Sequence, residues 1–408
     1  MRPFDRLLTS YTVNDLGDSI GVVALAVLVF DRTHDVAPTA GFFVVAKFLP
    51  ALFATGLTAH LDRLPLRRAL PAIYVIEALV FGGLAALAER GHFLLAVVLV
   101  LGFVDGTLAI TGRGLTRGAV AAVLQPRELL SEGNALMNLG FAFSSVFGAA
   151  LGGGLIAAFG LSVALLVDAA SFLIIALLLA SSGALPRLEH HDYEPWHVRV
   201  RAGLSFARAN RMVRTLLVGQ SLALVCFTIV VPIEVIYAKE TLGTTSAGYG
   251  VLLSAWGAGI VIGSLLFLGL KNKTGFVLII ASSAAVGLAY LGMSRANTVL
   301  VASLMSVVGG AGNGIQWVAV MTALQQATPS EYQSRMAGLL ESIGAALPGV
   351  GYVLGGVLVA VASPRLAFTV AGAGIMLLVI GALVLRPGHD RQTSTTTGKT
   401  IGRRLSRS

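Results

Sequence analysis

Cysteine is almost absent from the 408 residues, with Cys226 as its single occurrence, so a disulfide-stapled secreted domain is excluded. Charged side chains are also scarce: they make up 12% of the chain, about half the share usual in soluble domains. The 48 glycines follow no strict period of three, which excludes a collagen-like helix. An apolar share of 56% excludes a disordered chain, and the composition that remains is that of a membrane protein.

Long apolar stretches are what the sequence has in abundance, and a stretch of about 20 residues suffices to cross a bilayer as a helix. We expect an all-α membrane protein with twelve spans, at 9-30, 39-61, 69-88, 92-112, 132-158, 161-182, 213-238, 246-270, 276-293, 297-325, 335-361 and 364-386. Asn14, Asp15 and Asp18 interrupt the first stretch, so we expect no cleavable signal peptide and a first helix that stays in the mature protein.

The basic residues indicate how the chain lies in the membrane. Lysine and arginine outnumber aspartate and glutamate 29 to 20, a net charge of +9. Twelve spans put both termini on one side, and 23 of the 29 basic residues then fall on that side. The positive-inside rule predicts that both termini are cytoplasmic in a multi-pass protein of the cell (inner) membrane. Because topology accounts for the charge, we expect no nucleic-acid partner.

The longest polar stretch separates two halves of six spans each. We predict an N-terminal six-helix bundle over 1-183, a cytoplasmic linker over 184-212, a C-terminal six-helix bundle over 213-387 and a disordered basic cytoplasmic tail over 388-408. Within the linker, 196-209 suits either an amphipathic helix on the inner leaflet or a solvated helix between the halves.

The two halves resemble each other in sequence. Residues 131-156 align with 334-359, and residues 39-44 align with 246-251 at a similar offset. Equal halves with an even number of spans form a parallel repeat about an axis along the membrane normal. Such repeats predict a site between the halves, near the middle of the membrane.

Motifs for phosphate, metal or nucleophilic chemistry are missing from the sequence. The string TTTGKT ends like a Walker A loop, but Thr393 stands where its first glycine belongs. His190 and His191 have no cysteine neighbours, and neither G-x-S-x-G nor H-E-x-x-H occurs. We therefore expect that the chain is not an enzyme and has no cofactor and no metal site.

Ionisable residues inside the apolar spans are the strongest functional signal, because charge is costly in hydrocarbon. Asp15 and Asp18 are three residues apart and so share one face of the first span. In span four, Arg113 follows Asp105 by eight residues and lies near the same face. A carboxylate that exchanges protons with either side of the membrane can couple proton entry to substrate exit.

The loop between spans two and three, GLTAHLDRLPLRRAL, resembles the signature loop of the major facilitator superfamily. The resemblance implies a gate that holds the cytoplasmic side shut, formed by Asp62, Arg63, Arg67 and Arg68. The loop departs from the pattern at Thr58 and Pro65, where glycines are usual, and at Leu66, where an arginine is usual. The departures leave the gating role in place and put a strict loop geometry in doubt.

Two further strings are similar to motifs of the same superfamily. RGLTRGAVAAV in span four resembles the arginine motif that the family links to proton movement, and GAALGGG in span five resembles the Gly-Pro-x-x-Gly-Gly motif of exporters. Ala149 replaces the proline of that motif. Gly148, Gly152 and Gly153 permit close helix packing, and ordinary packing explains them as well as an exporter motif does.

The architecture of this superfamily places spans one, four, seven and ten around a central cavity. The resemblance therefore favours these residues for proton coupling or substrate contact: Asp15, Asp18, Asp105, Arg113, Glu234, Asn313 and Gln316. Hydrogen bonds between helices explain Asn313 and Gln316 about as well. Glu77 and Asp168 are interpreted as structural partners of neighbouring helices.

Four strings, at 16-33, 167-179, 201-218 and 246-266, are similar to the macrolide-efflux and enterobactin-exporter group of bacteria. This similarity implies a monomeric, proton-coupled antiporter that exports amphipathic small molecules of drug, macrolide or siderophore type. Its partners would be the substrate, protons and membrane lipids. Two alternatives stay open: a transporter of lysophospholipids or other solutes with the same fold, and a membrane scaffold that transports nothing.

Overall fold

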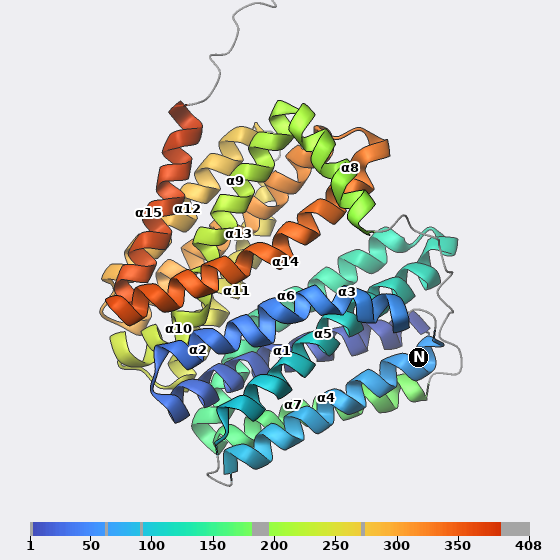
Figure 1. Ribbon diagram of the computed structural model, residues 1–408, viewed down its shortest axis with the longest axis vertical. Helices are drawn as coiled ribbons and strands as arrows, with labels where there is room; N and C mark the ends of the chain where they lie inside the picture. The colour runs from blue at the N-terminus through green and yellow to red at the C-terminus, as the bar shows by residue number, and fades with distance from the viewer. Residues whose placement is uncertain (1–2, 62–63, 90–92, 182–195, 271–273, 385–408) are drawn as a thin grey trace, which may run out of the picture.

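The computed structural model describes residues 3–61, 64–89, 93–181, 196–270 and 274–384. Every regular element in these residues is helical, and twelve helices or helix pairs are long and apolar enough to cross a membrane (Figure 1). The all-α fold with twelve spans is therefore confirmed.

The spans are built from fourteen of the fifteen α-helices. The first half contains α1 (Pro3–Thr33), α2 (Val36–Phe43), α3 (Leu49–Leu61), α4 (Leu66–Glu89), α5 (Leu95–Leu124), α6 (Leu130–Phe159) and α7 (Leu161–Ala180). The second half contains α8 (Trp196–Ala209), α9 (Arg211–Thr228), α10 (Glu234–Ile236), α11 (Ser246–Leu270), α12 (Gly275–Arg295), α13 (Val299–Gln326), α14 (Ser330–Val361) and α15 (Pro364–Val384). Helices α2 and α3 form one span, as do α9 and α10, and α8 is the helix outside the spans.

The second span changes its winding at Lys47. Pro50 has no N–H to donate to the carbonyl of Ala46, four residues earlier. A π-helical turn, Val44–Phe48, stands at this place between α2 and α3. Gly106 of α5 packs against the Ala46 carbonyl so closely that a Cβ there would overlap its oxygen. The proline and the glycine together fix the backbone that carries Lys47.

The two halves converge at one end of the molecule. We call the end where α1 begins the terminus end, and the end where α1 finishes the opposite end. In Figure 1 the halves meet near α2 and α10 and splay apart toward α8 and the N-terminus. At the opposite end, the Lys239 Nζ bonds an Asp31 carboxylate oxygen at 2.7 Å across the halves. The ring of Phe43 meets that of Tyr352 edge-on, with centroids 6.0 Å apart.

Helices α6 and α11 form a second contact between the halves, through small residues. A Cβ on Gly153 would overlap the Ser246 carbonyl oxygen, and one on Gly250 would overlap that of Ala149. Farther along the same crossing, Gly257 lies against the Ser145 backbone. Backbones that approach this closely make a tight crossing on the side of the opposite end.

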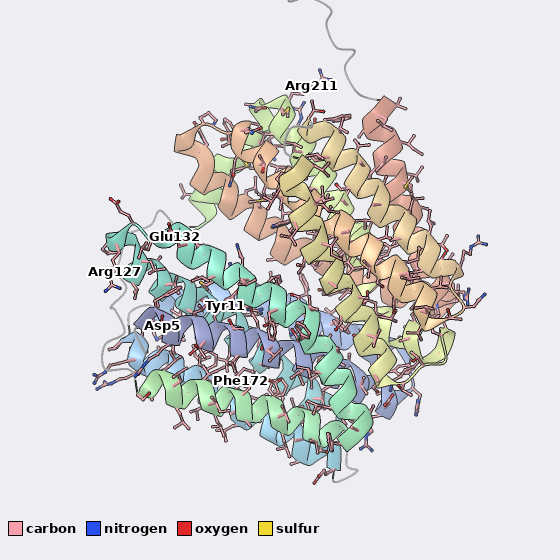
Figure 2. All side chains as sticks on the ribbon, turned by 180° about the vertical axis from the view of Figure 1, so that it is seen from behind. Asp5, Tyr11, Arg127, Glu132, Phe172 and Arg211 are labelled. Carbon is pink, nitrogen blue, oxygen red and sulfur yellow. The ribbon has the colours of Figure 1, made fainter. Side chains whose placement is uncertain are left out.

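Two arginines at the opposite end donate to backbone carbonyls at helix ends. Arg32 donates to the Ala88 carbonyl at the end of α4, at 2.6 Å, and Arg365 donates to the Ala296 carbonyl just after α12, at 3.0 Å. These carbonyls would otherwise lack partners, because the last turn of a helix leaves them free. At the terminus end of the first half, charged residues such as Arg127 and Glu132 face outward (Figure 2).

The linker helix α8 packs against helices of the second half. Residues 182–195 of the linker predicted at 184-212 lie outside the described residues, and the remainder holds α8 and the start of α9. Phe206 of α8 stacks on Tyr332 of α14, with ring centroids 4.5 Å apart. Ala207 is buried in a small apolar cluster with α9, α13 and α14. The tail predicted at 388-408 also lies outside the described residues.

The fourth span is the one whose predicted end is clearly wrong. The prediction stopped it at residue 112, whereas α5 continues to Leu124. Arg113 and Arg117 resembled a membrane boundary in the sequence. In the structure Arg113 lies in mid-helix, where carboxylates of α1 compensate its charge.

Candidate functional site

A cavity of about 310 Å³ lies between the two halves. Its walls come from α1, the π-helical turn, α5, α6 and α11, so both halves contribute. Asp15 is twelve residues into α1, which at a rise of about 1.5 Å per residue places it ~18 Å from the helix start. Because α1 has 31 residues, Asp15 lies near the middle of this helix.

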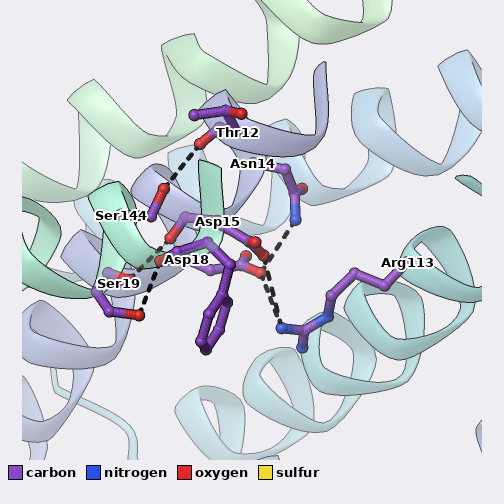
Figure 3. A network of polar contacts seen from close by, with 9 residues as sticks. Thr12, Asn14, Asp15, Asp18, Ser19, Arg113 and Ser144 are labelled. Carbon is purple, nitrogen blue, oxygen red and sulfur yellow. Dashed lines mark hydrogen bonds and ion pairs between the residues drawn. The ribbon is translucent and has the colours of Figure 1, made fainter. Parts of the chain in front are cut away.

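The charged wall consists of two carboxylates that share one guanidinium. Arg113 Nη1 lies 3.9 Å from Asp15 Oδ1 and 3.8 Å from Asp18 Oδ2 (Figure 3). The side chain of Asp15 is 4% exposed and that of Asp18 is 14% exposed, whereas Arg113 is 37% exposed. Asp18 is therefore the acid more open to the cavity.

Local hydrogen bonds hold the α1 segment in place. Asn14 donates to Asp18 Oδ2 at 3.1 Å, and the Ser19 hydroxyl donates to the Asp15 carbonyl at 2.8 Å (Figure 3). The Ser144 hydroxyl of α6 reaches across to the Thr12 carbonyl at 3.1 Å. These bonds fix the α1 backbone, and both acids point toward Arg113 of α5.

Two of the three glycines singled out in the sequence bring α6 against α1. A Cβ on Gly148 would overlap the Ser19 side chain, and Gly152 lies against the Ile20 backbone. Gly153 faces the other way, onto α11. The glycines thus join α6 to the acid-bearing helix on one side and to the second half on the other.

The apolar wall of the cavity is aromatic and aliphatic. It is formed by Val22, Phe141, Leu253, Trp256 and Ile260. Trp256 stacks on Tyr290 with ring centroids 5.4 Å apart and planes inclined at 21°. A charged wall that faces an apolar one suits an amphipathic ligand.

Lys47 also lines the cavity, and the sequence reasoning did not include it among the site residues. The architecture that the resemblance implies favours spans one, four, seven and ten, whereas Lys47 belongs to span two. The signal that points to it is Pro50, three residues later, because a proline inside a span predicts a local change of winding.

Asp105 lies behind the cavity wall and does not pair with Arg113. Its side chain is buried, and Oδ1 has no hydrogen-bond partner among the described residues. Lys47 is the cation that acts on it most strongly. Eight residues along a helix correspond to about 12 Å, so Arg113 bonds the acids of α1 and not the acid of its own helix.

Three other predicted residues lie away from the cavity lining. The Gln316 amide nitrogen donates to Gln220 Oε1 at 2.9 Å, a bond between α13 and α9. Asn313, one turn earlier on α13, does not line the cavity, and neither does Glu234, which begins α10. The structure therefore does not bring these three together with Asp15, Asp18 and Arg113.

The predicted gate loop is described in part. Asp62 and Arg63 lie outside the described residues. Arg67 and Arg68 are exposed in the first turn of α4, at the terminus end.

Two further acids are buried inside the first half. Both carboxylate oxygens of Glu77 lack hydrogen-bond partners among the described residues. Asp168 accepts a hydrogen bond from Ser171 at 3.3 Å and packs against Gly17 and Gly21 of α1. Their position between α1, α4 and α7 keeps them out of the cavity lining.

Solved structures of transporters share the fold of the whole chain. A nucleoside transporter NupG (D323A mutant) matches with a TM-score of 0.74 at 12% identity, covering 95% of this chain and 100% of that chain. A bacterial homologue of the iron transporter ferroportin, in its inward-facing state, matches with 0.71 at 15% identity, covering 94% and 98%. The xylose transporter XylE from E. coli matches with 0.66 at 13% identity, covering 97% and 100%.

Sequence comparison identifies the family. No curated protein matches the chain significantly. A family model described as transmembrane secretion effector matches residues 2–339, most of the chain. Taken with the twelve spans and the shared transporter fold, this match shows that the chain is a multi-pass membrane protein and belongs to the transmembrane secretion effector family of the major facilitator superfamily.

Proposed function

We propose that the protein is a secondary exporter of amphipathic small molecules, driven by proton antiport through alternating access. The observation that carries the proposal is the cavity between the halves, in which Asp15 and Asp18 share Arg113 opposite an apolar wall. Similarity to the macrolide-efflux and enterobactin-exporter group supports export, a bacterial cell (inner) membrane and cytoplasmic termini.

The charged wall supplies a coupling device. When both carboxylates are ionised they attract Arg113, and a proton on either one removes part of that attraction. Protons and a cationic or hydrogen-bond-donating part of a substrate compete for the same carboxylate oxygens. Such competition is what an antiporter needs, because each ligand must leave before the other binds.

The arrangement of the halves supplies the second requirement, access from one side at a time. The contacts of Asp31 with Lys239 and of α6 with α11 hold the halves together at the opposite end. With the termini in the cytoplasm, this state receives substrate from the cytoplasm. The outward state needs the opposite contacts to open and the terminus end to close, where Asp62 and the arginines of its loop would act.

Flux in proteoliposomes tests the proposal. The full chain is reconstituted with an inward-acidic pH gradient, and accumulation of rhodamine 6G, an amphipathic cation, is followed by fluorescence. We expect uphill accumulation that a protonophore abolishes. Equal dye levels with and without the gradient would refute proton antiport.

The alternatives predict other outcomes of the same assay. A transporter of lysophospholipids would move a fluorescent lysolipid while ignoring the dye, and a scaffold would move neither.

A further inference from the structure

Lys47 presents a cation to the cavity and forms no ion pair within the described residues. Of the two lysines in the described part of the chain, Lys239 pairs with Asp31 at the opposite end. Lys47 lines the cavity, and no described carboxylate lies within 4.0 Å of it. Charge at this depth is costly without a partner, so it indicates a ligand contact.

The backbone that carries Lys47 is fixed independently of any ligand. It lies in the π-helical turn, with the buried Ala46 held against Gly106 on one side and Pro50 following on the other. π-Helical turns inside helices are frequent at functional sites, because they aim side chains that a regular helix would turn away.

The charges of the cavity are divided between two places. Arg113 lies 3.9 Å from Asp15 and 3.8 Å from Asp18, whereas Lys47 lines the cavity from the second span and forms no ion pair with either acid. Two carboxylates share one close guanidinium, which leaves an excess negative charge near α1. Lys47 is the positive charge of the lining at the second span, and the acid that it influences, Asp105, lies outside that lining.

We propose that Lys47 binds an acidic group of the substrate, so that the transported molecules are zwitterionic amphiphiles. The cationic end of such a molecule faces Asp18, its acidic end pairs with Lys47, and its apolar body packs on Trp256 and Phe141. This inference rests on the proposed exporter function and specifies its substrate class.

Linkage favours a zwitterion over a simple anion. A proton on Asp15 or Asp18 makes the cavity more positive, so a simple anion would bind more tightly with the proton and travel in the same direction. The cationic end of a zwitterion competes with the proton and preserves antiport. The acidic end of the zwitterion then adds affinity and selects among substrates. It takes no part in the coupling of transport to protons.

A matched pair of amphiphiles tests the assignment by binding. Octyl betaine and octyltrimethylammonium have the same tail and the same quaternary nitrogen, and only the betaine has a carboxylate. Their affinities are measured in lipid nanodiscs from the emission of Trp256, in a background with Trp196→Phe and Trp317→Phe. Trp256 lines the cavity, so its emission responds directly to a ligand bound there.

Lys47→Gln should weaken octyl betaine binding about tenfold, the loss usual for a hydrogen bond to a charged group. The same variant should strengthen octyltrimethylammonium binding, because it removes a like charge. Lys47→Arg should restore the preference for the betaine. Loss of both affinities together, or an unchanged ratio, would overturn the proposal.

Two additions keep the test decisive. If Lys47→Gln does not fold because Asp105 loses its counter-charge, the double variant Lys47→Gln/Asp105→Asn removes both charges and is measured in its place. Rhodamine 6G flux by the wild type is recorded separately. A wild type that binds the betaine selectively and moves no dye would contradict the exporter function and leave the role of Lys47 standing.

Discussion

Arg113 is the residue on which the charged wall depends. It comes from α5, whereas both of its acids come from α1, so the two ion pairs join helices that are far apart in the sequence. Asp15 is almost fully buried, while Asp18 and Arg113 are open to the cavity. Asp18 is therefore the acid that a molecule in the cavity can contact more readily, and Asp15 is the more buried partner of Arg113.

Asp18→Asn should abolish proton coupling while leaving the fold intact. The amide keeps the size of the side chain and can still bond Asn14, but it cannot release a proton. We expect gradient-driven efflux of rhodamine 6G to fall at least about tenfold, which corresponds to ~1.4 kcal/mol. Initial rates in proteoliposomes with and without a pH gradient measure this.

The matched control for this prediction is Asp35→Asn. Asp35 is exposed and caps α2 by accepting from the Ala37 N–H, a role that asparagine fills equally well. The Asp35→Asn variant should transport at the wild-type rate. If Asp18→Asn and Asp15→Asn both sustain uphill, proton-dependent efflux near that rate, α1 does not carry the coupling proton and Asp105 becomes the next candidate.

Part of the site follows from the sequence, and the reason differs by residue. The spacing of three residues suffices to put Asp15 and Asp18 on one helix face, and the cost of charge in hydrocarbon marks Arg113. Lys47 could not be placed, because its direction depends on a π-helical turn. Gln316 was placed by analogy with family architecture, and its bond to Gln220 is a packing contact that no spacing reveals.

At the scale of elements, α6 is the helix that connects the acid-bearing helix α1 to the contact between the halves. Gly148 and Gly152 lie against α1, and Gly153 lies against α11. Any motion that separates α6 from α11 must therefore pull on the backbone next to Asp15 and Asp18. If the proposed antiport holds, this connection gives a physical route by which protonation on α1 would bias the opposite end.

Gly153→Val should destabilise the protein, and Gly154→Val should not. A Cβ at Gly153 would overlap the Ser246 carbonyl oxygen, whereas one at Gly154 meets nothing within 4 Å. We expect a loss of about 1–3 kcal/mol for Gly153→Val, typical of overpacking, visible as a lower Tm in thermal unfolding of the purified protein. Equal Tm values for the two variants would show that the α6–α11 crossing is loose.

Element boundaries were predictable wherever hydrophobicity alone decides them. The span predicted at 246-270 coincides with α11, and that at 161-182 nearly coincides with α7. The prediction failed at α5, since hydropathy treats every arginine as a boundary and cannot detect a carboxylate on another helix. Compensated charge is thus the reason why hydropathy misplaced the end of this span.

At the scale of the whole molecule, the fold shows which groups three cations of the opposite end contact. Arg32 and Arg365 each bond carbonyls at a helix end, and Lys239 bonds Asp31. With the termini in the cytoplasm, as proposed, these cations would run against the positive-inside rule, and each has a hydrogen-bond partner in the fold. The ion pair of Asp31 with Lys239 differs from the other two contacts because it joins the two halves.

Reversing this ion pair should shift the equilibrium between the closed and open states of the opposite end. Asp31→Lys or Lys239→Asp alone places like charges together, and the double reversal restores attraction. Spin labels at Ala37 and Thr245, which are exposed near the pair on different halves, report the distance in a Cys226→Ala background. The expected shift is about fivefold in the ratio of the two populations, because partly exposed pairs contribute up to ~1 kcal/mol.

Glu240→Lys is the control, since Glu240 is exposed beside Lys239 and forms no ion pair within the described residues. Glu240→Lys changes the charge of the same surface by the same amount as Asp31→Lys does. The distance between the spin labels should stay as it is in the wild type. Each single reversal should add a longer distance, and the double reversal should remove it. If the double reversal stays open, the closed state is held by the α6–α11 crossing and the Phe43–Tyr352 contact, and Asp31 with Lys239 only follows them.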